Sequence, residues 1–253
     1  MTNNGFNICM GLDVSTSCIG ISVVIDDNTY NGKLVEMTHI KLKKDKNAND
    51  IENLFLKKKQ FISFIEKFKN YAVDKVFIEE PLLSSNNKNT VATLLRFNGM
   101  ISDAIYTIFG VVPDYISSYD SRLYCFPELM AVRKFDKAGK PYENKKIIKS
   151  IKDSKIVLFG SYPWTIDKKQ VVQEKINEIY PNINWIYDKK GELKKENFDG
   201  ADSLVSCIGM IHKLHYGEFI PKIENIVINE ETVEYDVYYW DKKEHRKTYL
   251  NVN

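Results

Sequence analysis

Three strand-like apolar segments follow one another at the start of the chain, with only short polar links between them. They cover residues 6–14, 18–26 and 34–42, and the first two are separated by the tripeptide Ser-Thr-Ser. Runs of this length, rich in Val and Ile and bounded by turn-forming residues, favour β-strands. Consecutive strands with short connections predict an antiparallel meander, and this feature most restricts the possible folds.

After the meander, helical segments alternate with further strand-like segments. Apolar residues recur at about 3.6-residue spacing in segments 49–72, 88–110, 167–180 and 197–214. Short apolar runs at 74–81 and 111–118 predict two more strands, whereas 119–165 shows no clear pattern. Strands that alternate with helices pair in parallel. We therefore predict one mixed α/β sheet, an antiparallel meander joined to parallel strands, with helices on both faces.

Composition narrows the class of protein. The 253 residues, 43% apolar and 28% charged, are enough for a real core in one large domain or two small ones. No apolar run is long enough to span a bilayer, and the N-terminus lacks the pattern of a signal peptide. The four cysteines have no metal-binding spacing. We expect a cytoplasmic protein, in the host cell if viral, with reduced, buried thiols and no membrane partner.

Charge is distributed unevenly along the chain, although the net charge is only +2. Residues 133–155 contain nine Lys or Arg against three acids, with Phe135 and Tyr142 among them. The tail, 218–253, contains eight acids against five bases. The basic block is either a solvated surface or a phosphate-binding one, with Lys145 and Lys146 as candidate contacts.

Four acidic residues fall where a mixed sheet presents its functional site. Asp13 ends the first predicted strand, Glu79 ends the fourth, and Asp199 and Asp202 lie beside the apolar stripe of the last helix. If the two strands are neighbours, four carboxylates converge at one rim and repel one another. Magnesium, which prefers oxygen ligands, would offset this repulsion. Each acid also has an ordinary alternative: capping a turn, solvation at a strand end, or interaction with a helix N-terminus.

Three motifs in this order resemble the RuvC-type Holliday-junction resolvases of the ribonuclease H-like nuclease superfamily. They are MGLDVSTSCIGISVV, VFIEEPLLSSNNKNTVATLLRFNGMISDAI and NFDGADSLVSCIG. The resemblance spans roughly residues 6–126 and 166–214. It implies a ribonuclease H-like fold and an endodeoxyribonuclease that cleaves Holliday junctions or related branched DNA, including flaps and replication forks, as a homodimer.

The resemblance also implies roles for individual residues. Asp13 would bridge two Mg²⁺ ions, with Mn²⁺ as a substitute, and Glu79, Asp199 and Asp202 would complete the site for two-metal hydrolysis. Glu79 is preferred to Glu80 because it directly follows the apolar run. The segment DKKQVV resembles the family's basic segment, so Lys168 or Lys169 would contact the scissile phosphate. Arg96 and Phe97 are candidate junction contacts, although their helix could equally be a core helix or a dimer interface.

Two regions depart from a minimal family member. A basic insertion at about 127–165 and a β-rich extension at 218–253 suggest an extended phage- or virus-type resolvase. We expect a nuclease domain over 1–217 that contains the insertion, with the extension packed on it. His212 and His215 have no assigned role.

Two other functions fit parts of the pattern. The first motif also resembles the phosphate-binding opening of actin-like kinases, but no second such motif occurs in the sequence. A non-catalytic nucleic-acid-binding protein on the same fold is the other alternative.

Overall fold

The computed structural model describes residues 6–29, 31–81, 87–126, 168–228 and 233–248. Five strands form the central sheet: β1 (Asn7–Val14), β2 (Cys18–Asp26), β3 (Lys33–Lys41), β4 (Lys75–Glu79) and β5 (Asp114–Ile116). Their order is β3-β2-β1-β4-β5. The first three pair antiparallel, and β4 and β5 continue the sheet parallel to β1. The predicted meander and mixed sheet are confirmed, in the strand order and directions of the ribonuclease H-like fold.

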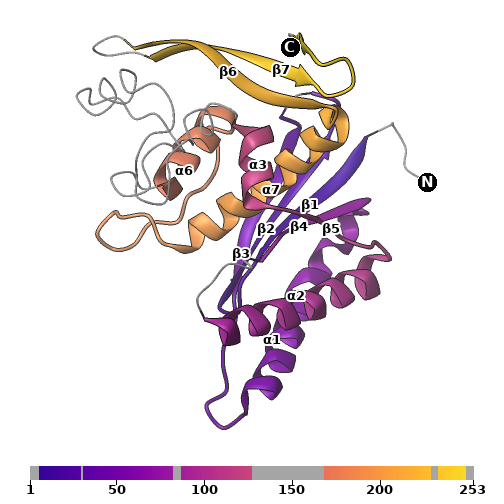
Figure 1. Ribbon diagram of the computed structural model, residues 1–253. Helices are drawn as coiled ribbons and strands as arrows, with labels where there is room; N and C mark the ends of the chain where they lie inside the picture. Colours follow the sequence, from indigo (N-terminus) through magenta and orange to yellow (C-terminus); the bar gives the residue numbers. More distant parts are fainter. Residues whose placement is uncertain (1–5, 30, 82–86, 127–167, 229–232, 249–253) are drawn as a thin grey trace.

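Helices cover both faces of this sheet, as predicted (Figure 1). The helices α1 (Asp50–Ile65) and α2 (Lys88–Phe109) lie on one face. The helices α3 (Ser118–Cys125), α6 (Lys168–Ile179) and α7 (Glu196–Tyr216) lie on the other. The segment predicted as one helix over 49–72 is divided, because after α1 it tightens into a 3₁₀ helix, Glu66–Tyr71. The helix α3 lies in the stretch whose sequence shows no clear pattern.

Local signals explain where the first two helices begin. The Asn49 side chain accepts a hydrogen bond from the Glu52 amide while the Glu52 carboxylate accepts one from the Asn49 amide, which is a reciprocal capping box. Asn87 caps α2 by accepting from two amides of its first turn. These caps satisfy amides that have no partner within the helix, so they define each N-terminus.

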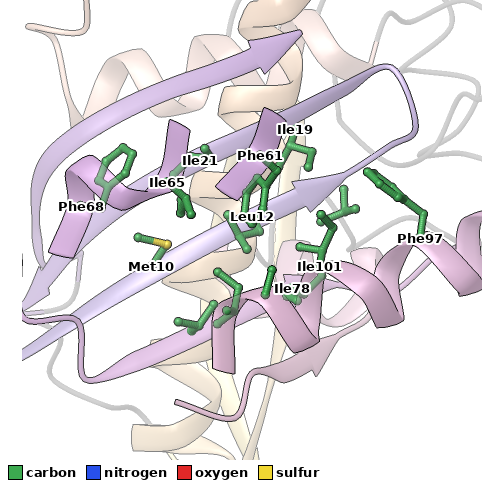
Figure 2. Close-up of a cluster of buried hydrophobic side chains, with 14 of the residues drawn as sticks. Met10, Leu12, Ile19, Ile21, Phe61, Ile65, Phe68, Ile78, Phe97 and Ile101 are labelled. Carbon is green, nitrogen blue, oxygen red and sulfur yellow. The ribbon is translucent and has the colours of Figure 1, made fainter. Parts of the chain in front are cut away.

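Alternate residues of the central strands serve two separate cores. Met10 and Leu12 of β1 and Ile78 of β4 point toward α1 and α2, where they pack with Phe61 and Ile101 (Figure 2). The alternate residues of the same strands, including Cys9 and Phe77, point the other way and pack against α7 and its neighbours. This division follows from the two-residue period of a strand, which sends successive side chains to opposite faces.

Two glycines let the backbone of α7 lie directly on the sheet. A Cβ atom at Gly20 of β2 would overlap the carbonyl oxygen of Asp199, and one at Gly11 of β1 would overlap that of Ser203. Only a residue without a side chain allows so close an approach. The two glycines therefore set the position of α7, and with it the position of the two predicted acids on that helix.

The tail after α7 forms a separate antiparallel sheet. It consists of β6 (Phe219–Ile228), β7 (Val233–Asp241) and β8 (Arg246–Thr248), in that order. The prediction of a β-rich extension is confirmed for these strands, whereas the domain extents 1–217 and 218–253 stay a prediction. The four cysteines are free and buried. No helix in the described ranges has both the length and the apolar character needed to cross a bilayer.

The close approach of α7 predicts that a single methyl group at Gly20 is strongly destabilising. We expect Gly20→Ala to lower the free energy of unfolding by about 3 kcal/mol, since the added carbon must push helix and sheet apart. Gly99, on the exposed side of α2, is a matched control with open space around it. Gly99→Ala should raise stability by about 0.5–1 kcal/mol because alanine is a better helix former. Denaturant titrations of both variants measure this, and equal stability of the two would contradict it.

Candidate active site

Asp13 and Glu79 lie at the same rim of the sheet. In the parallel pairing of β1 and β4, Gly11 is opposite Phe77 and Leu12 is opposite Ile78. Asp13 and Glu79 are the next residues on their strands, so both leave the sheet at its C-terminal edge. The expectation that the two strands are neighbours is confirmed.

The helix α7 brings the other two acids to this rim. Asp13 is paired with Gly20 in the antiparallel register, and the backbone of Asp199 lies directly on Gly20. Asp202 follows one turn later, and Ser206, a further turn along, donates a hydrogen bond of 3.4 Å to Glu79. The four carboxylates that the sequence distributes over 190 residues thus belong to one neighbourhood, which we call the carboxylate rim: Asp13, Glu79, Asp199 and Asp202.

Burial and mutual repulsion make it unfavourable to ionise the whole rim. Burial, followed by the charges of Glu79, Asp202 and Asp199, raises the pKa of Asp13 well above its ordinary value. Burial and the charge of Asp202 raise the pKa of Glu79 to about 7. The pKa of Asp202 is also raised, chiefly by burial. Groups whose pKa values depart this far from the ordinary are typical of functional sites, because folding alone gains nothing from holding them together.

Two cations face the rim from neighbouring helices. Arg122 of α3 places Nη2 3.5 Å from Oδ1 of Asp202. Its charge partly offsets the rise in the pKa of both Asp202 and Glu79. Lys169 is exposed in the first turn of α6. Its charge partly offsets the rise in the pKa of Asp13, Glu79 and Asp202. Lys169 belongs to the basic segment singled out in the sequence. Arg122 was missed, because its stretch shows no periodicity and its partner is 80 residues away.

Other predicted contacts are placed differently. Phe97 is 0% exposed and packs in the core between α2 and the sheet, so its prediction as a DNA contact is wrong (Figure 2). The α2 sequence positions it on the apolar stripe, whereas Arg96 beside it is exposed. The side chain of Lys168 and all of Lys145 and Lys146 lie outside the described residues.

The contacts of three further side chains, Ser15, His212 and His215, show what each of them does. The turn after Asp13 is closed by Ser15, whose hydroxyl accepts from the Cys18 amide and donates to the Cys18 carbonyl. His212 is buried and donates from Nδ1 to the Tyr124 carbonyl at 2.8 Å. His215 pairs with Asp26 at 2.9 Å. The two histidines therefore have packing partners outside the carboxylate rim.

The donor set of the rim suits a hard divalent cation, since carboxylate oxygens are what Mg²⁺ and Mn²⁺ prefer. As the side chains lie, no three His, Cys, Asp or Glu groups in the described ranges are arranged to hold a metal ion. Like charges hold carboxylates apart, and a bound cation would allow them to converge by side-chain rotation. The four carboxylates are therefore suitable ligands for a metal ion, but they would have to move closer together to coordinate it.

No protein-family model and no curated protein matches the chain. Solved structures do match it. Thermus thermophilus RuvC in complex with a Holliday junction substrate is 10% identical and has a TM-score of 0.47, over 83% of this chain and 96% of that one. The yeast mitochondrial Holliday junction resolvase Ydc2 is 11% identical, with a TM-score of 0.46 over 83% and 81%. The human cytomegalovirus terminase nuclease domain is 13% identical, with a TM-score of 0.33 over 84% and 86%.

The raised pKa of Glu79 predicts a pH-dependent cost in the metal-free protein. A carboxyl whose pKa is about 7 folded and 4.5 ordinarily binds more protons when folded, so its contribution to stability falls as pH rises between those values. We expect Glu79→Gln to match the wild type in unfolding free energy at pH 4 and to exceed it by about 3 kcal/mol at pH 8.

Denaturant titrations without divalent metal measure this difference. Glu80→Gln is the matched control, since Glu80 is exposed beside Glu79 and outside the rim. A Glu79→Gln variant that is less stable than the wild type at pH 8 would show that Glu79 is stabilised by cations rather than repelled by its neighbours.

Proposed function

We propose that this chain is a divalent-metal-dependent endonuclease that hydrolyses phosphodiester bonds in branched DNA. The observation that carries the proposal is the carboxylate rim itself. Four acids from three distant segments of chain are gathered at one edge of a ribonuclease H-like sheet and are flanked by Arg122 and Lys169. Such an arrangement is costly to fold and is useful for holding divalent cations against a phosphate.

In this proposal Asp13, at the centre of the rim, contributes to both of two Mg²⁺ sites, and Glu79, Asp199 and Asp202 complete them. When bound, the ions would supply an activated water and stabilise the charge that develops on the leaving oxygen. The chain supplies the geometry, because β1, β4 and α7 hold the carboxylates on rigid elements rather than on loops. Mn²⁺ would substitute, since it takes the same oxygen ligands.

Cationic side chains must overcome the repulsion between this rim and a DNA backbone. Lys169 is exposed and within electrostatic reach of three rim acids, so we assign it a contact with the phosphate that is cleaved. Lys168, Lys145, Lys146 and Arg96 are proposed as further backbone contacts. These contacts provide affinity and position, not sequence preference.

The finer parts of the proposal rest on the three sequence motifs. They favour a Holliday junction, or a related flap or fork, as the substrate and a homodimer as the active form. They also favour an extended phage- or virus-type member, with a nuclease domain over 1–217 and an extension over 218–253. The same fold serves kinases and non-catalytic binding proteins, so the site and not the fold must carry the assignment.

Cleavage of labelled DNA tests the proposal directly. With Mg²⁺ or Mn²⁺, the wild type should cut a four-way junction faster than a linear duplex of the same sequence. Asp13→Asn and Asp202→Asn should each reduce the rate by more than about a hundredfold. Loss of a residue that only supports a metal ligand reduces the rate by up to about that much, and loss of a ligand itself should cost more. Both variants should still bind the junction, because each replaces a carboxylate by a neutral isostere.

Glu80→Gln is the matched control and should cleave normally, because Glu80 is exposed and is not one of the rim acids. Normal cleavage by Asp13→Asn would refute the site. Junction binding by the wild type without cleavage under any divalent metal would favour the non-catalytic alternative. Metal-dependent ATP hydrolysis without cleavage would favour the kinase.

The role of Lys169 predicts a change in salt dependence. Lys169→Ala should weaken junction binding at every sequence tested, and the slope of log affinity against log salt should become shallower by about 1, because one phosphate contact is lost. Binding isotherms at several salt concentrations measure this. Lys190→Ala, in the exposed loop before α7, is the control and should leave the slope unchanged.

A further inference from the structure

The helix α3 is fixed on α7 by contacts on either side of Arg122. Nζ of Lys213 donates to Oδ2 of Asp120 at 2.8 Å, and Nδ1 of His212 donates to the Tyr124 carbonyl at 2.8 Å. Between them, a Cβ atom at Gly209 would overlap the backbone of Ser121, so the two helices are in direct backbone contact there. This short helix therefore has little freedom to move relative to α7.

Arg122 extends from this anchored helix to the carboxylate rim. Its Nη2 lies 3.5 Å from Oδ1 of Asp202, and the side chains are 26% and 13% exposed respectively. The charge of Arg122 also acts on Glu79. Asp202 is the only ion-pair partner of Arg122 among the residues that the structure describes. Most of the five N–H donors of the guanidinium thus remain available to a second anion.

We infer that Arg122 is a positioning residue that acts as the resident counter-cation of the rim, competing with divalent metal for Asp202. This inference rests on the proposed function. Before metal binds, the guanidinium offsets part of the repulsion between Asp202 and Glu79 and holds Asp202 in place. With a divalent ion at Asp202 to supply that neutralisation, the guanidinium of Arg122 would be repelled from Asp202 and its fork would face an incoming phosphate.

The competition follows from the charges involved. Two cations that share one carboxylate repel each other, so each lowers the affinity of the site for the other. An arginine is suited to this position because its planar fork fits either a carboxylate or a phosphate. The arrangement would give loose metal binding without DNA and tighter binding when a phosphate engages Arg122.

Mn²⁺ binding without DNA tests the inference, with free Mn²⁺ followed by electron paramagnetic resonance. Arg122→Gln should bind Mn²⁺ about fivefold more tightly than the wild type, because a competing charge is removed. Arg122→Lys keeps the charge and should stay near the wild-type affinity. Junction cleavage should nevertheless be slower in Arg122→Gln, so metal affinity and activity should change in opposite directions.

Lys213→Ala controls for the docking of α3, since it removes one anchor but keeps Arg122 itself, the His212 hydrogen bond and the backbone contact at Gly209. It should not tighten Mn²⁺ binding. Weaker or unchanged binding by a folded Arg122→Gln, or equal tightening by Lys213→Ala, would overturn the inference, and the thermal unfolding midpoint verifies folding.

The same titration separates this inference from the proposed function. Suppose that the wild type binds Mn²⁺, that Asp13→Asn abolishes this binding, and that Arg122→Gln leaves the affinity unchanged. This result would overturn only the role of Arg122. A wild type with no Asp13-dependent Mn²⁺ binding would overturn both.

Discussion

The contact on which this structure depends is the direct seating of the α7 backbone on two glycines of the central sheet. Gly20 is the register partner of Asp13 and touches Asp199, while Gly11 touches Ser203 one turn further along the helix. A side chain at either position would lift the helix off the sheet. The acids of α7 would then lose their proximity to those of β1 and β4, although every strand and helix could still form.

That seating brings together groups that oppose folding. The rim acids are buried enough, and close enough to one another, that the pKa values of Asp13, Glu79 and Asp202 all rise. Arg122 and Lys169 offset part of the repulsion but do not cancel it. Stability must come from apolar packing, which both faces of the sheet provide. Met10, Leu12 and Ile78 pack against α1 and α2, and Cys9 and Phe77 pack against α7. Both faces of the sheet thus hold the protein together, and the face that α7 covers also holds the site.

The helices α2 and α3 are attached to the rest of the protein in different ways. The α2 helix is fixed by large apolar side chains such as Phe97 and Ile101, which belong entirely to the core. The α3 helix is short and places only Cys125 in the apolar core, and it is also held by an ion pair, a histidine hydrogen bond and a backbone contact at Gly209. Polar attachments of this kind specify orientation, which a cation aimed at one carboxylate requires. The placement of Arg122 is thus a consequence of how α3 docks.

The sequence alone determined most of the elements and their kinds, because strand and helix periodicity and a short link such as Ser-Thr-Ser are local properties of the chain. It did not indicate α3, which lies in a stretch without periodicity. It also identified Asp13, Glu79, Asp199 and Asp202 as a set, since acids at the ends of apolar runs stand out from their surroundings. Only the tertiary structure showed that α7 lies directly on Gly11 and Gly20, and that Arg122 faces Asp202. Those facts depend on which helix packs on which face and at what rotation. Such contacts join residues far apart in the chain, and no local pattern encodes them.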